Sequence, residues 1–393
     1  MRRATRGLST HEGIVHRTEF QPDRLQSARS IRGWSKKILA ERVGVSAGAI
    51  SHYESVSRPT TPSDDVLHRL ATELRVRPEF FFGDPLPRTG GVFWRRVSRT
   101  PAALRQRYEE LARLAGLALD ELGEPLGSAN LASLDISGLS PEDAALAVRA
   151  ASGLKLDEPI FSAVDLLERF GLWTHELQLE DSATVDACST RVDGRPIAFL
   201  NPAKADGYRT RYTSLHELYH MLAHSEPAED RDAKNEQESE ANRFASELLL
   251  PASVWADLRP RRGLNSPWSY LKAKGRYGIS VKALMYKTRD FMTDGEYRYG
   301  MMRYSQLGWN QGEASPDVCH TAVDDDRPMR GRWLVDQFGS VAALADALQC
   351  EVQLAALLVD EPVDVDDANK GSGQGSHRAG TVLSFPGESK LAN

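Results

Sequence analysis

A helix carrying two histidines is expected at Thr213–His224, which reads TSLHELYHMLAH. His216 and His220 lie four residues apart, with Glu217 beside the first. Four residues of an α-helix turn about 400° and rise about 6 Å, so both imidazoles leave one face and can share one metal ion. The helix is expected because apolar residues recur at helical spacing, at Leu215, Leu218, Tyr219, Leu222 and Ala223. The histidines flank this stripe, so we expect them to be half buried at the wall of a cleft.

A third metal ligand is expected from the next predicted helix, Asn235–Pro251, which its final proline ends or kinks. At about 100° per residue, Glu238 lies roughly 50° from the centre of the apolar face, whereas Glu240 lies about 110° away and Glu236 further. An inward carboxylate is costly unless it is paired or binds a metal, so Glu238 is the predicted ligand. The alternative is a solvated charge favoured by the helix dipole at a helix start. Asn242, one turn later, is placed to hold a ligand histidine by a hydrogen bond.

The pattern His-Glu-x-x-His is typical of zinc peptidases, although it also arises by chance on ordinary amphipathic helices. Catalytic zinc takes three protein ligands and keeps one open position for water. In such a site His216, His220 and Glu238 would hold Zn²⁺, and Glu217 would take a proton from the water.

Two runs of sequence resemble the ImmA/IrrE family of zinc metallopeptidases. They are Arg209–His224 and Glu238–Pro251, with weaker similarity upstream at Leu166–Gly171 and Ile197–Asn201. The resemblance implies a zincin-like domain over residues 136–310, with the ligands and catalytic glutamate just named. It also implies a protein substrate, typically a partner repressor or antitoxin in a stress or mobile-element switch.

Two further positions of the motif helix, Tyr219 and His224, have expected roles other than metal ligation. Tyr219 departs from the family pattern, where many members carry glycine, and it lies on the apolar stripe. His224 recurs in the family pattern but lies about 12 Å from His216 along the helix. Polar packing or substrate contact is therefore expected of His224, rather than metal ligation.

The N-terminal part of the chain predicts a helix-turn-helix. Ser35 and Ser46 are placed to cap two short helices on either side of Gly44, and three further helices complete a five-helix domain over residues 22–84. The segment Arg24–Glu54 closely resembles the XRE (phage-repressor-like) DNA-binding family. That resemblance implies double-stranded DNA as a partner, contacted by Lys36, Ser46, Ala47, Gly48, Ser51 and His52. The alternative is a protein-docking module.

Charge supports this division. The net charge is −6, yet residues 1–82 contain 14 Lys/Arg against 9 Asp/Glu, or +5, which leaves −11 for the remainder. A basic end on an acidic chain favours nucleic acid, weakly by itself.

The remaining segments complete a mainly α, α+β organisation. Residues 1–21 are expected to be a flexible arm, 85–135 a linker and connector helix, 328–362 a helical C-terminal segment and 363–393 a disordered tail. Extended stretches at 183–191 and 196–200 predict a small antiparallel sheet beside the motif helix.

Several classes of protein are disfavoured. No run approaches 18 apolar residues, so no membrane span is expected, and the N-terminus does not read as a signal peptide. The three cysteines show no metal spacing and favour a reducing cytoplasm, with Cys188 a buried packing residue or, less simply, an inhibitory thiolate.

A homodimer across two half-sites is the usual helix-turn-helix geometry. The main alternative is a non-proteolytic transcription factor or antitoxin, and a DNA-processing hydrolase is disfavoured because a single zinc with this motif suits peptide carbonyls.

Overall fold

The computed structural model describes residues 19–96, 100–122, 134–176, 185–201, 207–316, 319–321, 328 and 330–359. These residues form a mainly helical α+β structure, as predicted, in which one four-stranded sheet separates two large hydrophobic cores. Most of the expected arm and all of the expected 363–393 tail lie outside the described residues.

The N-terminal helices form because their ends are capped locally. They are α1 (Pro22–Ile31), α2 (Lys36–Val43), α3 (Ala47–Tyr53), α4 (Asp64–Leu74) and the 3₁₀ helix η1 (Pro78–Phe82). The Ser35 hydroxyl accepts a hydrogen bond from the backbone N–H of Ile38, and that of Ser46 from Ala49. Gly44 ends α2 with φ +73°, a left-handed conformation that favours glycine. The caps and the turn predicted from sequence are thus confirmed.

The sheet contains β1 (Phe93–Arg96), β2 (Trp173–Glu176), β3 (Val185–Val192) and β4 (Arg195–Leu200), in the order β1-β3-β4-β2. A tight turn joins β3 to β4, with φ +45° at Asp193 and +82° at Gly194, as a hairpin with an Asp-Gly turn requires. The two predicted strands therefore pair antiparallel. The prediction of a wholly antiparallel sheet is wrong, because β2 adds beside β4 in parallel.

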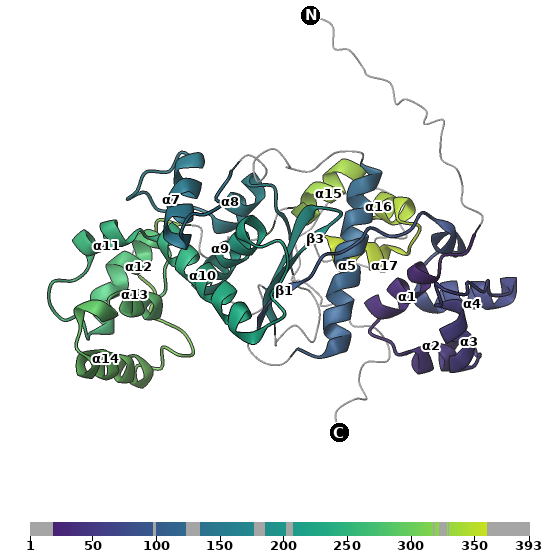
Figure 1. Ribbon diagram of the computed structural model, residues 1–393, viewed down its shortest axis with the longest axis horizontal. Helices are drawn as coiled ribbons and strands as arrows, with labels where there is room; N and C mark the ends of the chain where they lie inside the picture. The colour runs from purple at the N-terminus through teal and green to yellow at the C-terminus, as the bar shows by residue number, and fades with distance from the viewer. Residues whose placement is uncertain are drawn as a thin grey trace, which may run out of the picture.

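One face of the sheet packs against α5 (Ala102–Glu121), which stands between the sheet and the N-terminal domain (Figure 1). The approach of α5 to β3 is close, since a Cβ on Gly116 would lie 2.5 Å from Cγ1 of Val192. On its other side α5 packs against α1, where Arg113 forms an ion pair of 3.0 Å with Asp23.

The C-terminal segment packs in the hydrophobic core on the α5 side of the sheet. It comprises α15 (Arg330–Phe338), α16 (Val341–Ala347), α17 (Val352–Ala355) and the 3₁₀ helix η6 (Ala356–Leu358). Trp333 of α15 packs against Trp173 of β2, while Cys350 forms an isolated β-bridge with Val76 of the N-terminal domain. This segment therefore contacts both the sheet and the helix-turn-helix.

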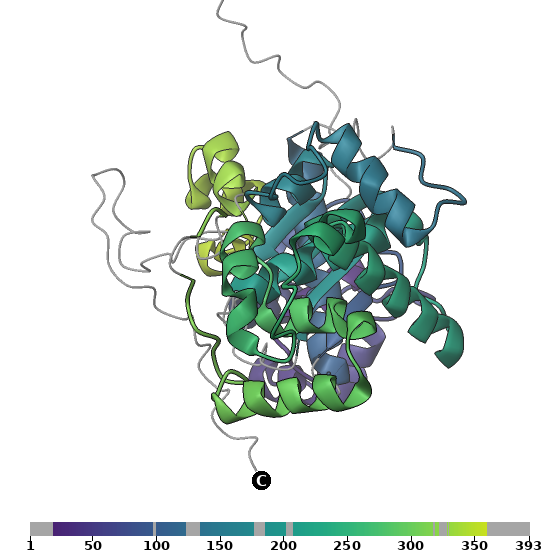
Figure 2. The ribbon, with the colours of Figure 1, turned by 90° about the vertical axis from the view of Figure 1, so that its left-hand side faces the viewer.

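The opposite face carries the motif helix. The helices there are α7 (Pro141–Ala151), α8 (Ala163–Arg169), α9 (Gly207–Ala223), α10 (Arg231–Leu249), α11 (Ala252–Leu258), η4 (Pro267–Tyr270), α12 (Leu271–Tyr277), α13 (Val281–Lys287), η5 (Arg289–Phe291) and α14 (Asp294–Gln306). Helix α9 packs directly on β3 and β4, and α10 packs across α9. Figure 2 shows α14 and the C-terminal helices on different sides of the molecule.

The segment expected to be a linker and connector helix contributes more than α5. It also supplies β1, which adds to the edge of the sheet beside β3. The register pairs Phe93 with Ser189 and Arg95 with Ala187. Since alternate residues of a strand point to one face, Phe93 and Arg95 share a face, and Phe93 packs in the core on the α9 side.

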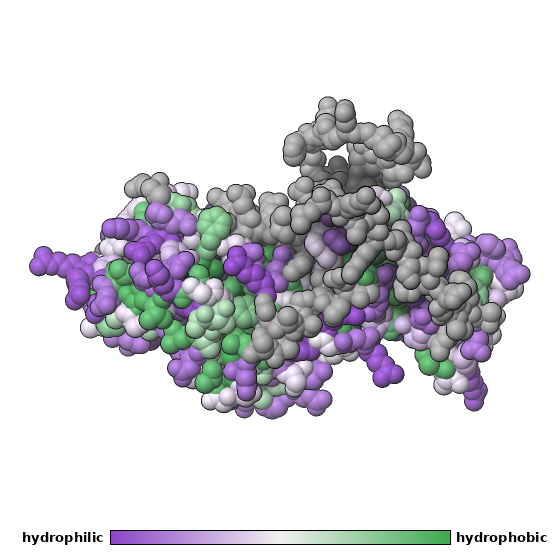
Figure 3. Space-filling view, turned by 90° about the horizontal axis from the view of Figure 1, so that it is seen from above, coloured by the Kyte–Doolittle hydropathy of each residue, from purple (hydrophilic) through white to green (hydrophobic). Residues whose placement is uncertain are grey.

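The surface is uneven in character. Among the described residues, every exposed large hydrophobic side chain except Val56 lies between Leu139 and Met302. Figure 3 shows hydrophobic residues on the half of the molecule that carries α7 to α14. No helix in the described part of the chain is long and apolar enough to cross a membrane.

Candidate metal centre and DNA-binding face

Helices α9 and α10 bring the three predicted ligands together. Nε2 of His216 lies 3.1 Å from Nε2 of His220, and the Glu238 carboxylate oxygens lie 3.4 and 3.6 Å from these two nitrogens. One donor atom from each residue falls within 4.8 Å of the others. The helical phase explains this, because the two histidines leave one face of α9 and Glu238 leaves the side of α10 that crosses it.

The protonation states suit metal binding. Burial lowers the pKa of His216 to about 3, so its imidazole is neutral at pH 7, as a ligand must be. Burial acts to raise the pKa of Glu238, but hydrogen bonds with His216 and His220 outweigh it and hold the pKa well below its usual range. The cluster thus offers two imidazole nitrogens and an ionised carboxylate, a set that suits zinc.

Strand β1 covers the centre. The ring of Phe93 stacks on that of His220, with centroids 4.5 Å apart. Together with β3 and α10, this strand leaves His216, Glu217 and His220 only 0%, 0% and 1% exposed. The expectation of half-buried histidines was wrong, since it did not include a strand supplied from more than 100 residues upstream.

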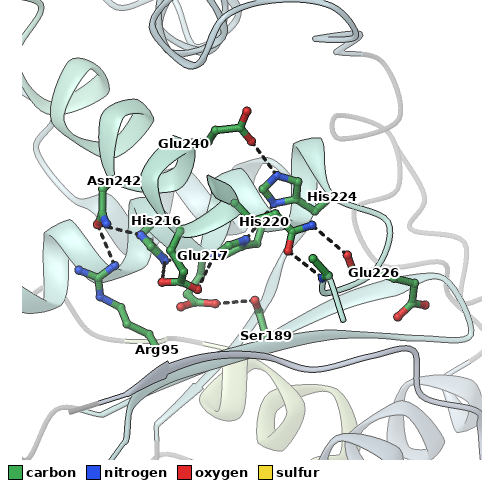
Figure 4. A network of polar contacts seen from close by, with 12 residues as sticks. Arg95, Ser189, His216, Glu217, His220, His224, Glu226, Glu240 and Asn242 are labelled. Carbon is green, nitrogen blue, oxygen red and sulfur yellow. Dashed lines mark hydrogen bonds and ion pairs between the residues drawn. The ribbon is translucent and has the colours of Figure 1, made fainter. Parts of the chain in front are cut away.

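Glu217 is held from the sheet below it. The Ser189 hydroxyl of β3 donates a hydrogen bond of 2.5 Å to Glu217 Oε2, whereas Oε1 has no hydrogen-bond partner among the described residues (Figure 4). Burial raises the pKa of this carboxyl to about 6. Cys188, which precedes Ser189 in the strand, is buried in the core on the other face of the sheet, where burial raises its pKa well above the usual value. The inhibitory-thiolate interpretation of Cys188 is therefore not supported.

Asn242 lies one turn beyond Glu238 and contacts His216. Its Oδ1 is 3.2 Å from His216 Nδ1, and it also accepts a hydrogen bond of 3.3 Å from Arg95. An oxygen acceptor at Nδ1 leaves Nε2 of His216 free for a metal. Arg95 lies in β1 and was missed by sequence reasoning, because nothing local marks the strand.

A cleft opens beside the centre. It has a volume of about 1840 Å³ and runs between α9–α10 and α12–α14, with Arg95, Tyr212, Glu238 and Asn242 in its lining. Four of the arginine and tyrosine side chains of α9 are candidate donors to a reacting oxygen. Arg211 donates to the backbone carbonyls of Ile160 and Phe161, Tyr219 packs against Phe244, and Arg209 pairs with Asp186. Tyr212 contacts a residue of the centre directly, since its hydroxyl donates a hydrogen bond to the backbone carbonyl of Asn242.

The candidate DNA-binding residues lie on α2 and α3. Ser46, Ala47, Gly48, Ser51 and His52 are exposed, whereas Ile50 between them is buried in the domain core. The Ser46 hydroxyl already caps α3, and Lys36 lies 3.4 Å from the buried carboxylate of Glu54. The face is thus open, with mostly small side chains.

Comparison with known families agrees with this geometry. Residues 25–81 match the family model described as helix-turn-helix, and residues 167–289 match the model described as IrrE N-terminal-like domain, a peptidase family. The chain therefore joins an XRE-type helix-turn-helix to an ImmA/IrrE-like domain, which confirms the predicted resemblance. No curated protein and no solved structure matches the chain. The second match contains the candidate ligands but not β1.

Proposed function

We propose that this chain is a DNA-binding transcriptional regulator whose body is a zinc-dependent metalloendopeptidase. The convergence of His216, His220 and Glu238 beside the buried carboxylate of Glu217 carries the proposal. The donor set fits zinc in number and type, since catalytic zinc takes three protein ligands drawn from histidine and carboxylate side chains. The two family matches support both halves of the proposal.

The residues around the centre have distinct tasks in this proposal. Zinc, when bound, supplies a Lewis acid that makes water a nucleophile near neutral pH and polarises a peptide carbonyl. Ser189 holds Glu217 Oε2, and Oε1 has no hydrogen-bond partner in the part of the chain that the structure describes. Oε1 is therefore the atom that would take the proton of the attacking water and deliver it to the leaving amine. Asn242 orients His216 through Nδ1.

The partners follow from the two halves. The helix-turn-helix would bind double-stranded DNA through α3, as a homodimer across two half-sites. The peptidase substrate would be a partner repressor or antitoxin, and the cleft beside Glu238 is where its chain would lie. The cysteines pair in no disulfide among the described residues, and a cytoplasmic location is proposed.

Metal content tests the centre directly. The full chain, purified without added zinc, is expected to contain about one zinc per molecule by plasma mass spectrometry, and Glu238→Ala to lose it. Glu236→Ala is the matched control, because it removes an exposed carboxylate from the same helix. A wild-type chain that takes up no zinc, even when zinc is supplied, would remove the basis of the peptidase proposal.

Proteolysis needs a second test. Glu217→Gln is expected to retain zinc and DNA binding but to lose cleavage, read as new protein N-termini that appear in cells expressing the wild type and not the variant. N-termini that appear equally with both proteins would contradict a catalytic role for Glu217.

The burial of the three motif residues also favours a second candidate function. His216 and His220, two of the three proposed ligands, are 0% and 1% exposed, and a metal held by buried side chains can stabilise the fold of a non-proteolytic regulator or antitoxin. In that case Glu217→Gln would leave repression of a reporter operator unchanged and produce no change in N-termini, while zinc removal would lower the thermal midpoint.

A further inference from the structure

His224 lies one helical turn beyond His220 and touches the candidate centre without belonging to it. Its Nδ1 is 2.9 Å from Nδ1 of His220, and its Nε2 is 3.1 Å from Oε2 of Glu240 (Figure 4). The ring is confined by Phe93, stacked at 5.9 Å, and by Tyr219, edge-on at 5.3 Å. Its side chain is 10% exposed, whereas that of Glu240 is 29% exposed.

These contacts determine where the protons lie if His220 binds zinc through Nε2. A neutral imidazole has one N–H and one lone pair, so Nδ1 of His220 must then carry the proton. That N–H can donate only to a lone pair on Nδ1 of His224, which places the proton of His224 on Nε2. From there it donates to the Glu240 carboxylate, which accepts only.

The opposite arrangement is incompatible with the site. A proton on Nδ1 of His224 would require a lone pair on Nδ1 of His220, and the proton of His220 would then occupy Nε2. That nitrogen would be blocked as a ligand. Only one pair of tautomers therefore satisfies both contacts and leaves His220 able to bind a metal.

We propose that His224 and Glu240 are positioning residues, which hold His220 in the tautomer and orientation that zinc requires. The inference rests on the zinc site proposed above. Helix α10 would then supply one ligand, Glu238, and a support for each histidine, with Asn242 serving His216 and Glu240 serving His220 through His224. The spacing of the metal ligands along the sequence therefore does not indicate this role of His224.

Zinc affinity of the full chain, measured by competition with a coloured chelator at pH 7.5, tests this role. His224→Leu removes the acceptor and is expected to weaken zinc binding roughly 10- to 100-fold, the range typical of lost ligand supports. His224→Asn can place an amide oxygen near the former Nδ1 and is expected to recover most of the affinity. Glu240→Gln should give a smaller loss. Glu236→Gln, the same change at an exposed position of α10, should give none.

The tautomers can also be observed without any variant. Long-range proton–nitrogen spectra of ¹⁵N-histidine-labelled, zinc-loaded protein should show His224 protonated at Nε2 alone and His220 at Nδ1 alone. A residue that only fills space would have no required tautomer, and this readout does not depend on whether His224→Leu folds.

The outcomes distinguish the positioning role of His224 from the existence of the zinc site. Wild-type affinity in His224→Leu, equal weakness in His224→Leu and His224→Asn, or a proton on Nδ1 of His224 would overturn the positioning role while leaving the zinc site intact. Failure of the wild type to bind zinc would instead overturn the proposed function.

Discussion

Acid is expected to destabilise this protein through His175, a buried residue of β2. Its ring stacks on Phe199 with centroids 5.6 Å apart, and its Nε2 accepts a hydrogen bond from Nε1 of Trp173. Burial lowers the pKa of His175 from 6.5 to about 3. In the unfolded chain the imidazole binds a proton below pH 6.5, whereas in the folded protein it stays neutral, so the free energy of unfolding falls as the pH drops from 6.5 towards 3. At pH 5, about 1.5 units below the unfolded pKa, the loss is about 2 kcal/mol.

His175→Gln removes this titration while retaining an acceptor for the Trp173 N–H. Urea unfolding of both proteins is followed by tryptophan fluorescence at pH 7.5 and pH 5, with EDTA present so that metal release does not contribute. Between the two values the wild type is expected to lose about 2 kcal/mol more than the variant. An equal loss in both proteins would show that the folded state protonates His175 readily, and would refute its assignment as a buried neutral group.

Three further substitutions probe the two halves of the chain. Glu54→Gln should lower the free energy of unfolding of the helix-turn-helix by about 3–5 kcal/mol, because it leaves the buried Arg29 without its counter-charge. Thermal unfolding measures this loss, and a loss below about 1 kcal/mol would contradict the expectation. Gly116→Ala should lower the free energy of unfolding by urea by about 1–3 kcal/mol, because the new Cβ meets Val192. Gly312→Ala should be neutral, because its new Cβ would meet no atom of another described segment within 4 Å, and similar values for the two variants would count against close packing of α5 on β3. His52→Ala should weaken binding to a selected operator by about 1–3 kcal/mol and leave binding to random DNA unchanged. Both affinities are measured by anisotropy titration at one salt concentration, and an equal loss on both DNAs would mean that His52 makes no base-specific contact.

Features that depend on neighbouring residues could be predicted from the sequence. The helix-turn-helix follows from serine caps and a glycine turn, and the motif helix from apolar residues at a period near 3.6. The β3–β4 hairpin carries an Asp-Gly turn between its strands. The choice of Glu238 over Glu236 and Glu240 as the third ligand also depended only on helical phase. Glu238 lies closest to the apolar face of its helix, where a carboxylate needs a partner or a metal.

Features that join distant parts of the chain appeared only in the tertiary structure. Strands β1 and β2 have four residues each and no alternating pattern. Their formation depends on pairing with β3 and β4 at the two edges of the sheet. The contact between Arg95 and Asn242 spans 147 positions, and the stacking of Phe93 on His220 has a similar reach.

The sequence by itself therefore determined the two domain types and the residues able to bind a metal, because helical period and caps are local properties. The tertiary structure decided how deeply those residues are buried, which strand covers them, and which atoms of Asn242 and His224 face their rings. Such contacts depend on sheet register and helix crossing, where many side chains compete for the same space and no short segment carries the outcome.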